Sequence, residues 1–156
     1  MSKSRRRFER ALFELGIEGS IFDLPGSTRT ADEAAAAVGC TVSQIAKSLI
    51  FRGKTSGEAV LAVMSGSNRV SLSKFEAHLG ESIERADAAF VREVTGYAIG
   101  GVPPFGHKSP VRTALDAELF ALGDIWAAAG GPFSVFQTTP EGLEAATHAP
   151  RVDLAE

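Results

Sequence analysis

The strongest constraint on the fold of this chain is a pair of apolar runs separated by a short turn. Residues 45–52 and 58–65 both have the length and pattern of a β-strand. Between them, the segment Gly53-Lys-Thr-Ser-Gly57 supplies the glycines of a turn. We therefore expect the two runs to pair as a hairpin, which is then the first element of a sheet.

A single lysine, Lys47, lies within the first of these strands. Side chains alternate along a strand, so the face that Lys47 shares with Leu49 and Phe51 is otherwise apolar, and the opposite face offers Ala46, Ser48 and Ile50 up to residue 51. An ammonium group in such surroundings is costly unless it binds an anion or has a lowered pKa. Lys47 is therefore a candidate functional residue. A structural lysine that reaches the sheet edge or pairs with a carboxylate fits the same pattern.

Helical and strand-like segments alternate along the chain without a regular rhythm. A capping box at Thr30–Glu33 opens a short helix that Gly39 ends, and Pro140 takes the first position of the last helix. Helices are also expected at residues 4–15, 71–80 and 87–94, one turn at 41–44, and strands at 111–116, 124–129 and 133–138. This order predicts an α/β (mixed) fold with a mixed sheet.

Length and composition favour one domain and exclude several classes of protein. With 156 residues, of which 44% are hydrophobic, the chain can bury a core, and we expect residues 1–156 to form a single domain. A lone cysteine, Cys40, cannot form an internal disulfide, and no Cys/His cluster has the spacing of a metal site. No apolar run approaches the roughly 20 residues of a membrane span, so a soluble cytoplasmic protein is expected.

The balance of charge argues against a protein that coats long nucleic acids. The net charge is −3 and the pI is about 5.7, so the surface is not generally basic. One cluster of basic residues lies near the start of the sequence and consists of Lys3, Arg5, Arg6, Arg7 and Arg10. A solvated basic tail and a local patch that contacts RNA both fit this cluster.

Two glycine-rich segments are further candidates for a binding site. The segment Gly100-Gly-Val-Pro-Pro-Phe-Gly-His107 combines glycines, which let a ligand approach the backbone, with prolines that hold a turn rigid. Gly130-Gly131-Pro132 offers the same combination at a junction between strands. A tight connection without function explains either segment equally well. Neither contains the phosphate-binding pattern of nucleoside triphosphatases or dinucleotide enzymes, and no local Ser/His/Asp or Cys/His set suggests a nucleophile.

Three segments, taken together and in this order, carry a resemblance to a known family. They are Gln44-Ile-Ala-Lys-Ser-Leu-Ile-Phe51, Thr95-Gly-Tyr-Ala-Ile-Gly-Gly-Val-Pro-Pro-Phe-Gly106 and Ala129-Gly-Gly-Pro132. The chain resembles the YbaK/prolyl-tRNA synthetase-associated editing domains, the free-standing aminoacyl-tRNA deacylases. The resemblance implies a mixed, partly barrel-like β-sheet surrounded by short helices. It also implies hydrolysis of the ester that joins a wrong amino acid to the 3′ terminal adenosine of tRNA, with no metal or organic cofactor.

The resemblance further implies a set of site residues. Lys47 corresponds to the family's lysine, which anchors the phosphate or carbonyl region of the substrate. Gly100 and Gly101 belong to the loop that positions the aminoacyl carbonyl, where backbone N–H groups stabilise a developing oxyanion. The nucleophile is water, or a terminal ribose hydroxyl acting with it. Residues expected to bind the substrate are Ser48, Met64, Pro104, Phe105, His107, Gly130, Gly131 and Ser134, with Phe22 as a further candidate for the pocket lining.

The function predicted from this resemblance is trans-editing of mischarged tRNA. The expected substrate is tRNA(Pro) carrying a small wrong amino acid, namely alanine, cysteine, or serine or threonine. Because an acidic chain attracts tRNA weakly, prolyl-tRNA synthetase or an elongation factor is an expected partner. Ser48, where threonine is also familiar in the family, leaves the edited amino acid open, as does the segment 132–138. The oligomeric state is open too.

Two other functions compete with this prediction. A module that binds tRNA ends or a synthetase without catalysis is the main alternative. A pyridoxal phosphate enzyme with Lys47 as its Schiff-base lysine is disfavoured, because the phosphate-cradling helix start and the large domains of that chemistry are absent from the sequence.

Overall fold

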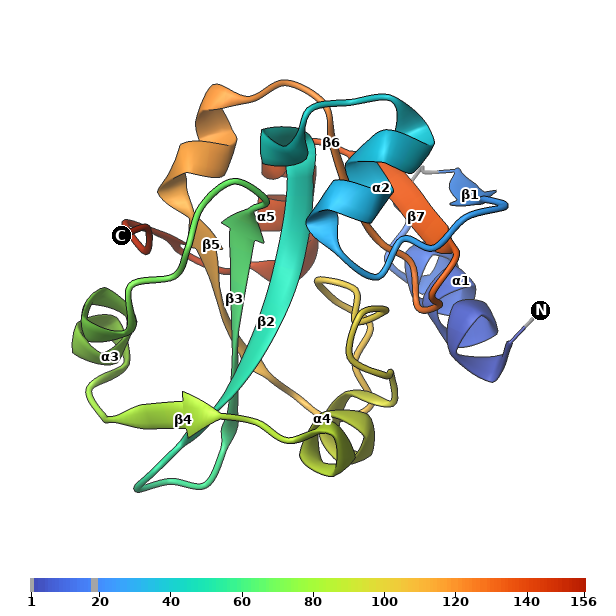
Figure 1. Cartoon of the computed structure of the whole chain (residues 1–156). Coiled ribbons are helices and arrows are strands. Elements are labelled where there is room, and N and C mark those ends of the chain that lie inside the picture. Colours follow the sequence, from blue (N-terminus) through green and yellow to red (C-terminus); the bar gives the residue numbers. More distant parts are fainter. Residues whose placement is uncertain (1, 18–19) are drawn as a thin grey trace.

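The computed structural model describes residues 2–17 and 20–156, and its centre is one mixed sheet (Figure 1). The order across the sheet is β1-β7-β6-β2-β3-β5-β8, and β4 pairs separately with β2. The strands are β1 (Ile21–Asp23), β2 (Ile45–Gly53), β3 (Ala59–Ser65), β4 (Ile83–Arg85), β5 (Arg112–Asp116), β6 (Ile125–Ala128), β7 (Ser134–Thr138) and β8 (Arg151–Val152). The expected mixed α/β fold is confirmed.

The predicted hairpin is the centre of this sheet. Strands β2 and β3 pair antiparallel from Ala46 opposite Ser65 to Arg52 opposite Ala59, with Lys47 opposite Met64. Every residue of β3 is buried. A fully buried central strand reads as a continuous apolar run, because both of its faces are covered.

Three of the five helices in the described structure begin at a side chain that caps the N-terminus and end at a left-handed glycine. The Thr30 hydroxyl accepts the Glu33 N–H at 3.1 Å, and Gly39 ends the same helix in the left-handed conformation with φ 76°. The helices are α1 (Lys3–Glu14), α2 (Ala31–Val38), α3 (Leu72–Leu79), α4 (Ala88–Thr95) and α5 (Pro140–Thr147), with 3₁₀ turns at η1 (Val42–Gln44) and η2 (Ala117–Ala121). The sequence predicted all five helices and η1 to within a few residues.

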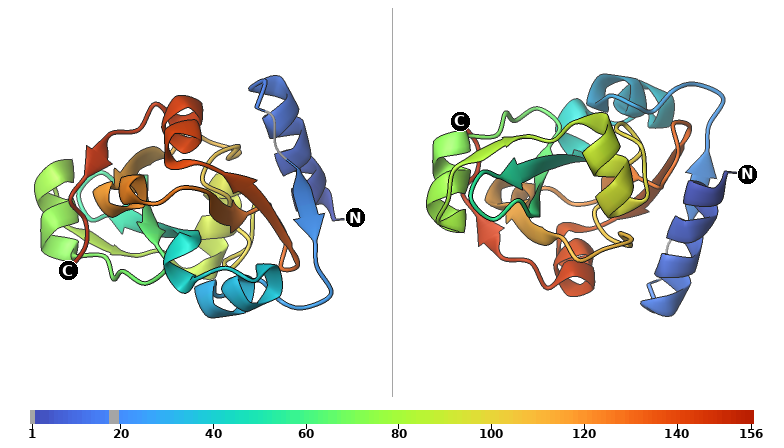
Figure 2. Two further views of the ribbon diagram at one scale, coloured as in Figure 1. Left: turned by 90° about the horizontal axis from the view of Figure 1, so that it is seen from above. Right: turned by 90° about the horizontal axis from the view of Figure 1, so that it is seen from below.

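The helices cover the sheet from both sides. Alternation along β3 sends Leu61 and Val63 into a large core shared with α1 and α5, whereas Ala62 and Met64 face a second core beneath α3. In the two views of Figure 2, α1 lies beside β1 at one end of the molecule, and α3 lies with the C-terminus at the other. These helices do not cover the face formed by β2 between α2 and α4, and the site lies on this face.

The shortest strands and the parallel pairings were not predicted. Strands β1, β4 and β8 have only two or three residues each, so they show no alternation that a sequence pattern could reveal. Asp23, the last residue of β1, pairs with Ser134 of β7, more than a hundred positions away in the sequence. Parallel pairs β2–β6, β3–β5 and β5–β8 depend on contacts between segments distant in sequence.

Candidate functional site

Lys47 lies half-buried in β2, near the point where β2 separates from β6. Its Nζ donates to the Gly66 carbonyl at 3.3 Å. Burial lowers the pKa of Lys47 below its ordinary value of 10.5, and the charge of Arg69 lowers it further, against the opposing charges of Asp32 and Asp116. The side chain is thus a cation held in partly desolvated surroundings without a direct ion-pair partner among the described residues.

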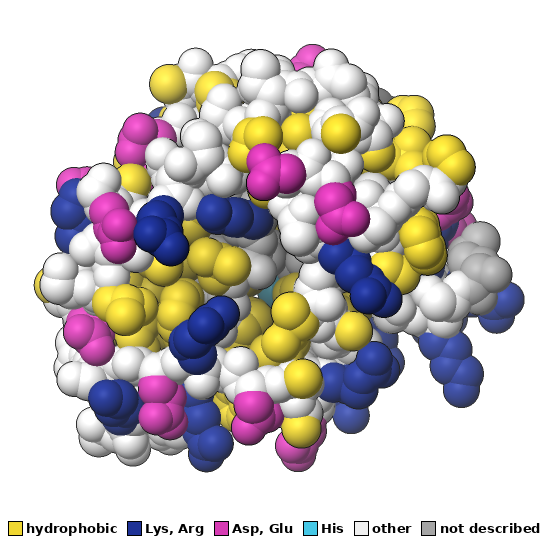
Figure 3. All heavy atoms as spheres, in the orientation of Figure 1, with side chains coloured by type: hydrophobic (Ala, Val, Ile, Leu, Met, Phe, Trp, Pro, Cys, Tyr) yellow, Lys and Arg dark blue, Asp and Glu magenta, His cyan; other side chains and the backbone are white. Residues whose placement is uncertain are grey.

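Two adjoining hollows meet at Lys47. The main hollow has a volume of about 600 Å³ and extends along β2 towards α4, and the small hollow, of about 270 Å³, extends beneath α2 towards β6. Six residues line both hollows and therefore mark their junction: Lys47, Ser48, Leu49, Ile99, Gly100 and Val102. Figure 3 shows an apolar depression on this face with Lys and Arg side chains around it.

Gly100 brings the second predicted segment to this junction. Its φ of 91° is left-handed, and a Cβ there would lie 3.1 Å from the Cβ of Arg29, so the turn requires glycine. Its N–H has no hydrogen-bond partner in the described part of the chain. Behind it, the Gly101 carbonyl accepts the Gly130 N–H at 3.1 Å, and a Cβ on Gly101 would lie 3.3 Å from the backbone of Gly131. The two glycine pairs therefore pack together, and the second supports the first.

Arginine side chains surround the junction. Arg69 and Arg85 line the main hollow and Arg29 lines the small one. None of the ion pairs found among the described residues involves these three arginines. Although the whole chain is acidic, the site itself carries unpaired positive charge, which suits a ligand with a phosphate group.

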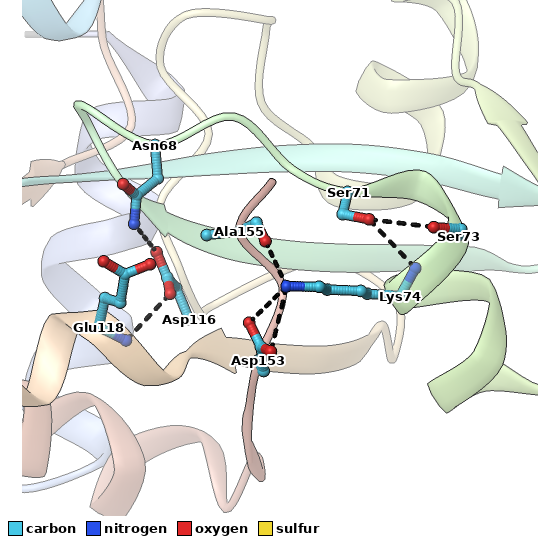
Figure 4. Close-up of polar contacts among 8 residues, drawn as sticks. All are labelled: Asn68, Ser71, Ser73, Lys74, Asp116, Glu118, Asp153 and Ala155. Atoms are coloured by element: carbon cyan, nitrogen blue, oxygen red, sulfur yellow. Dashed lines mark hydrogen bonds and ion pairs between the residues drawn. The ribbon is translucent and has the colours of Figure 1, made fainter.

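The turn after β3, which carries Arg69, is fixed by a buried carboxylate (Figure 4). Asp116 accepts hydrogen bonds from the Ser65 N–H at 3.1 Å, from the Asn68 side chain at 2.9 Å and from the Glu118 N–H at 3.0 Å. These bonds satisfy the carboxylate although Asp116 is only 1% exposed. The position of Arg69 therefore depends on β5 as well as on its own turn.

The C-terminal segment borders the other side of the main hollow. Glu156 lines the hollow, and its N–H donates to the Arg69 carbonyl at 3.0 Å. Lys74 of α3 holds this segment, because its Nζ donates to the Asp153 carboxylate at 3.0 Å and to the Ala155 carbonyl at 2.7 Å (Figure 4).

The structure places several other predicted site residues away from the junction. Met64 is fully buried in the core beneath α3 and lines neither hollow. Ser134 donates to the Asp23 carboxylate at 2.6 Å, next to the buried Arg5 that also binds this carboxylate. Phe22 is 40% exposed and stacks edge-on against Trp126. These residues build the walls behind the site and do not line the hollows.

Pro104, Phe105 and His107 line a separate hollow of about 390 Å³. Phe105 packs against Phe8 and Phe136 in the large core. The His107 Nε2 lies 2.8 Å from the Pro103 carbonyl, and burial lowers the pKa of His107 below 6.5 although this hydrogen bond opposes the shift. The His107 ring is therefore largely buried within its loop and lies outside both hollows at the junction.

Sequence patterns missed some of the residues around the junction. Arg69 and Arg85 reach it from the turn after β3 and from the end of β4, whose positions in space no local pattern reveals. Trp126 forms a wall of the small hollow from a predicted strand, and as the only tryptophan it was a signal that could have been used. Ile99 lines both hollows and is 59% exposed, and no local pattern of the sequence indicated its place at the junction.

Residues 2–17 and 20–156 contain no group of three or more His, Cys, Asp or Glu side chains placed to hold a metal ion. None of the helices in this part of the chain has the length and apolar character needed to cross a membrane.

Comparisons with known proteins agree with this geometry. YwhH of Bacillus subtilis, an uncharacterized protein, is 32% identical over 126 residues, which cover 81% of this chain and 80% of YwhH. The multifunctional Ser/Thr-tRNA deacylase ProXp-y of Escherichia coli is 32% identical over 89 residues, which cover 55% of this chain and 53% of ProXp-y. The chain thus matches only about half of that deacylase.

A solved structure described as that of a proposed trans-editing enzyme for prolyl-tRNA synthetase is 46% identical, with a TM-score of 0.93. The superposition covers 100% of this chain and 99% of that one. The sequence profile of the aminoacyl-tRNA editing domain matches residues 26–146, which include Lys47, Gly100 and every residue at the junction of the two hollows. The chain therefore belongs to the aminoacyl-tRNA editing domain family.

Proposed function

We propose that this protein is a trans-editing deacylase, which hydrolyses the ester between a small wrong amino acid and the 3′ terminal adenosine of tRNA(Pro). The observation that carries the proposal is the meeting of Lys47 and Gly100 at the junction of two hollows in a chain of this family. In this proposal the small hollow receives the side chain of the amino acid, and the main hollow receives the adenosine.

The chemistry requires charge stabilisation at the ester carbonyl and a positioned water molecule. The free N–H of Gly100 is a candidate donor to the developing oxyanion, and a rigid backbone donor acts without reorganising. Lys47 is the anchor that orients the phosphate or carbonyl region of the substrate. Neither hollow is lined by a histidine or a cysteine, so water or the ribose hydroxyl is proposed as the nucleophile.

The proposed substrate rests on volume and on the relatives. A space of about 270 Å³, shared with the backbone of the ester, suits alanine, cysteine, serine or threonine better than a large side chain. One relative is named as a deacylase of Ser/Thr-tRNA, and a structural neighbour is described in connection with prolyl-tRNA synthetase. Such an enzyme is useful because a synthetase pocket separates amino acids that differ by one methylene by only about 10–200-fold.

Delivery of the tRNA by another protein is part of the proposal. The net charge of −3 gives little long-range attraction for tRNA phosphates. We therefore expect prolyl-tRNA synthetase or an elongation factor to assist binding, and we place the reaction in the cytoplasm, where these partners work.

A deacylation screen tests the proposal. Alanyl-, cysteinyl-, seryl- and threonyl-tRNA(Pro) are incubated with the wild type, with Lys47→Ala and with the control Lys54→Ala, which removes an exposed lysine of the β2–β3 turn. Release of free amino acid is expected from at least one substrate. Lys47→Ala should slow this release by about tenfold or more, the cost of losing a charged hydrogen-bond partner. Binding of all four tRNAs without release of amino acid would instead support a non-catalytic binding module.

A further inference from the structure

Strand β2 has an open stretch on one of its edges. Along the edge that faces away from β3, pairing with β6 stops at Ala46 and pairing with β4 begins at Phe51. Both hollows lie against the residues between these two pairings. The open stretch therefore coincides with the site and not with the solvent-exposed rim of the sheet.

The register identifies the residue whose backbone points into this gap. The Ile45 carbonyl accepts the Gly66 N–H at 2.6 Å, and the Gly53 N–H donates to the Glu58 carbonyl at 2.9 Å, so both Ile45 and Gly53 direct their polar groups towards β3. In an antiparallel pair these directions alternate from one residue to the next. The N–H and C=O of Ser48, three residues after Ile45, therefore point towards the open edge.

Every polar group of Ser48 lacks a partner in the described residues. Neither its N–H nor its C=O takes part in a ladder with β4 or β6 or in a hydrogen bond with a loop. Its Oγ is the buried side-chain polar atom without a hydrogen-bond partner in this part of the chain. Native proteins rarely leave a buried polar group such as the Ser48 Oγ unsatisfied, because it costs about 1–3 kcal/mol when it is removed from water without a partner. Three free groups on one half-buried residue that lines both hollows indicate a position completed by a ligand.

We propose that Ser48 binds the α-amino acid part of the substrate as a strand edge binds one residue of an added strand. The Ser48 N–H donates to the ester carbonyl oxygen, and the Ser48 C=O accepts from the α-ammonium group. This inference rests on the proposed deacylase function and names the contact that recognises the aminoacyl group. Main-chain groups give affinity in this mode of recognition, and pockets beside the strand give specificity for side chains.

The proposal divides recognition between two parts of the site. Ser48 binds the ester carbonyl and the α-ammonium group, which all α-amino acid esters share. The small hollow beside it, which Trp126 lines, discriminates between side chains. An ester whose amino group is acylated keeps one N–H donor but loses the positive charge of the ammonium group, and charged hydrogen bonds are the stronger ones. The enzyme should therefore bind N-acetylaminoacyl esters more weakly than the free aminoacyl esters, whatever their side chain.

Amide hydrogen exchange tests the contact without any variant or any turnover. The probe is 3′-deoxy-3′-(L-alanylamino)adenosine, in which an amide replaces the ester. In the free protein the Ser48 N–H should exchange quickly, and in the saturated complex at least about tenfold more slowly. Leu49, whose N–H points to β3, is the internal reference and should be slow in both states. A slow Ser48 N–H in the free protein, or equal rates with and without the probe, overturns the proposal.

A backbone substitution tests the same contact in the reaction. Replacing the amide N–H at position 48 by an ester oxygen, with the hydroxy-acid analogue of serine, removes the donor and also makes the preceding carbonyl, that of Lys47, a weaker acceptor. Hydrolysis of alanyl-tRNA(Pro) should fall by about a hundredfold in kcat/KM, as expected for one oxyanion donor. The same replacement at Ser82, an exposed serine outside both hollows, is the matched control.

The two experiments separate failure of this inference from failure of the proposed function. If the wild type hydrolyses no aminoacyl-tRNA but the probe protects the Ser48 N–H, the deacylase proposal fails and the binding contact stands. If the wild type is active and the backbone ester at position 48 is as active as the one at position 82, the contact is wrong and the deacylase stands.

Discussion

The two halves of the loop between α4 and β5 are adjacent in the sequence but have different roles in the structure. In the first half, residues 98–102, the backbone reaches the junction of the hollows, and the Gly100 N–H has no partner in the described structure. In the second half, residues 103–107, Phe105 is buried in the large core and the backbone is tied down. A single glycine- and proline-rich motif therefore provides both a ligand surface and its support.

Hydrogen bonds make the second half rigid. The Tyr97 hydroxyl donates to the Gly106 carbonyl at 2.9 Å, and the His107 Nε2 binds the Pro103 carbonyl at 2.8 Å. Tyr97 is fully buried, and burial raises its pKa to about 12, so the phenol remains a donor throughout the range in which proteins are studied. The buried Phe105 ring and these two hydrogen bonds to backbone carbonyls thus hold the second half, which supports the free Gly100 N–H of the first.

Matched glycine variants in the two halves should show the largest difference. Gly100 and Gly106 are both left-handed, with φ of 91° and 80°. Gly100→Ala disturbs the free N–H at the junction, and we expect deacylation to fall by about a hundredfold, the effect of misplacing one oxyanion donor. Steady-state kinetics on alanyl-tRNA(Pro) measures this loss.

Gly106→Ala should lose stability and keep its activity. A Cβ at this position would lie 2.8 Å from the Cβ of Ala11 in α1, a neighbour that cannot rotate away. Backbone strain and overpacking together should lower the free energy of unfolding by about 2–4 kcal/mol, measured by urea unfolding. Below its unfolding transition, the variant should hydrolyse the same tRNA within about threefold of the wild-type rate. If Gly106→Ala loses as much activity as Gly100→Ala, the two halves are not distinct.

The same loop illustrates how far the sequence predicts the site. The residues of the motif were identified, and so was Lys47, because glycine, proline and a lone cation in an apolar strand each have a local physical meaning. The division of the motif into two halves was not predicted, since it depends on α1, which packs against Gly106 from far away in sequence. For this reason Pro104, Phe105 and His107 were grouped with Gly100 although they line another hollow.

The sequence predicted the elements of the fold that depend on nearby residues, but not the pairings that depend on distant ones. The hairpin and all five helices follow from turn and capping residues that act within a few positions. The parallel partners of β2 and β5, and hence the gap at Ser48, follow from the packing of separate elements. The pattern of apolar and polar residues does not indicate the residue at which pairing between β2 and β6 ends.

Lys47 and His107 extend the comparison to two basic side chains whose pKa values burial lowers. Lys47→Met should slow deacylation as Lys47→Ala does, yet it should raise the free energy of unfolding by about 0.5–2 kcal/mol, because a partly desolvated charge is replaced by an apolar side chain. Urea unfolding of the variant and of Lys54→Met, a change at an exposed lysine, measures the effect. A loss of stability would instead assign Lys47 a structural role.

The pH dependence of this gain has a definite sign. The unfolded chain keeps the Lys47 proton up to about its ordinary pKa of 10.5, and the folded chain releases it at a lower pH. Between these two values the unfolded state binds more protons, so the stability of the wild type rises with pH in that window. The advantage of Lys47→Met should therefore shrink as the pH approaches 10.5.

His107 should give the smallest effect, and it should appear in acid. Its pKa in the folded chain lies below the ordinary 6.5, chiefly because the ring is buried, so the unfolded chain takes up a proton that the folded chain resists. The stability that the neutral ring contributes is complete above 6.5 and is lost as the pH falls from 6.5 through the lowered pKa. His107→Gln can still donate to the Pro103 carbonyl but cannot titrate. The urea midpoint of unfolding is measured above and below pH 6.5. Its decrease in acid should be smaller for His107→Gln than for the wild type and for the control His148→Gln. His107→Gln should still deacylate the tRNA. An equal decrease of the urea midpoint in all three proteins would show that protonation of His107 does not oppose folding. Loss of deacylation in His107→Gln would show that residues 103–107 belong to the active site.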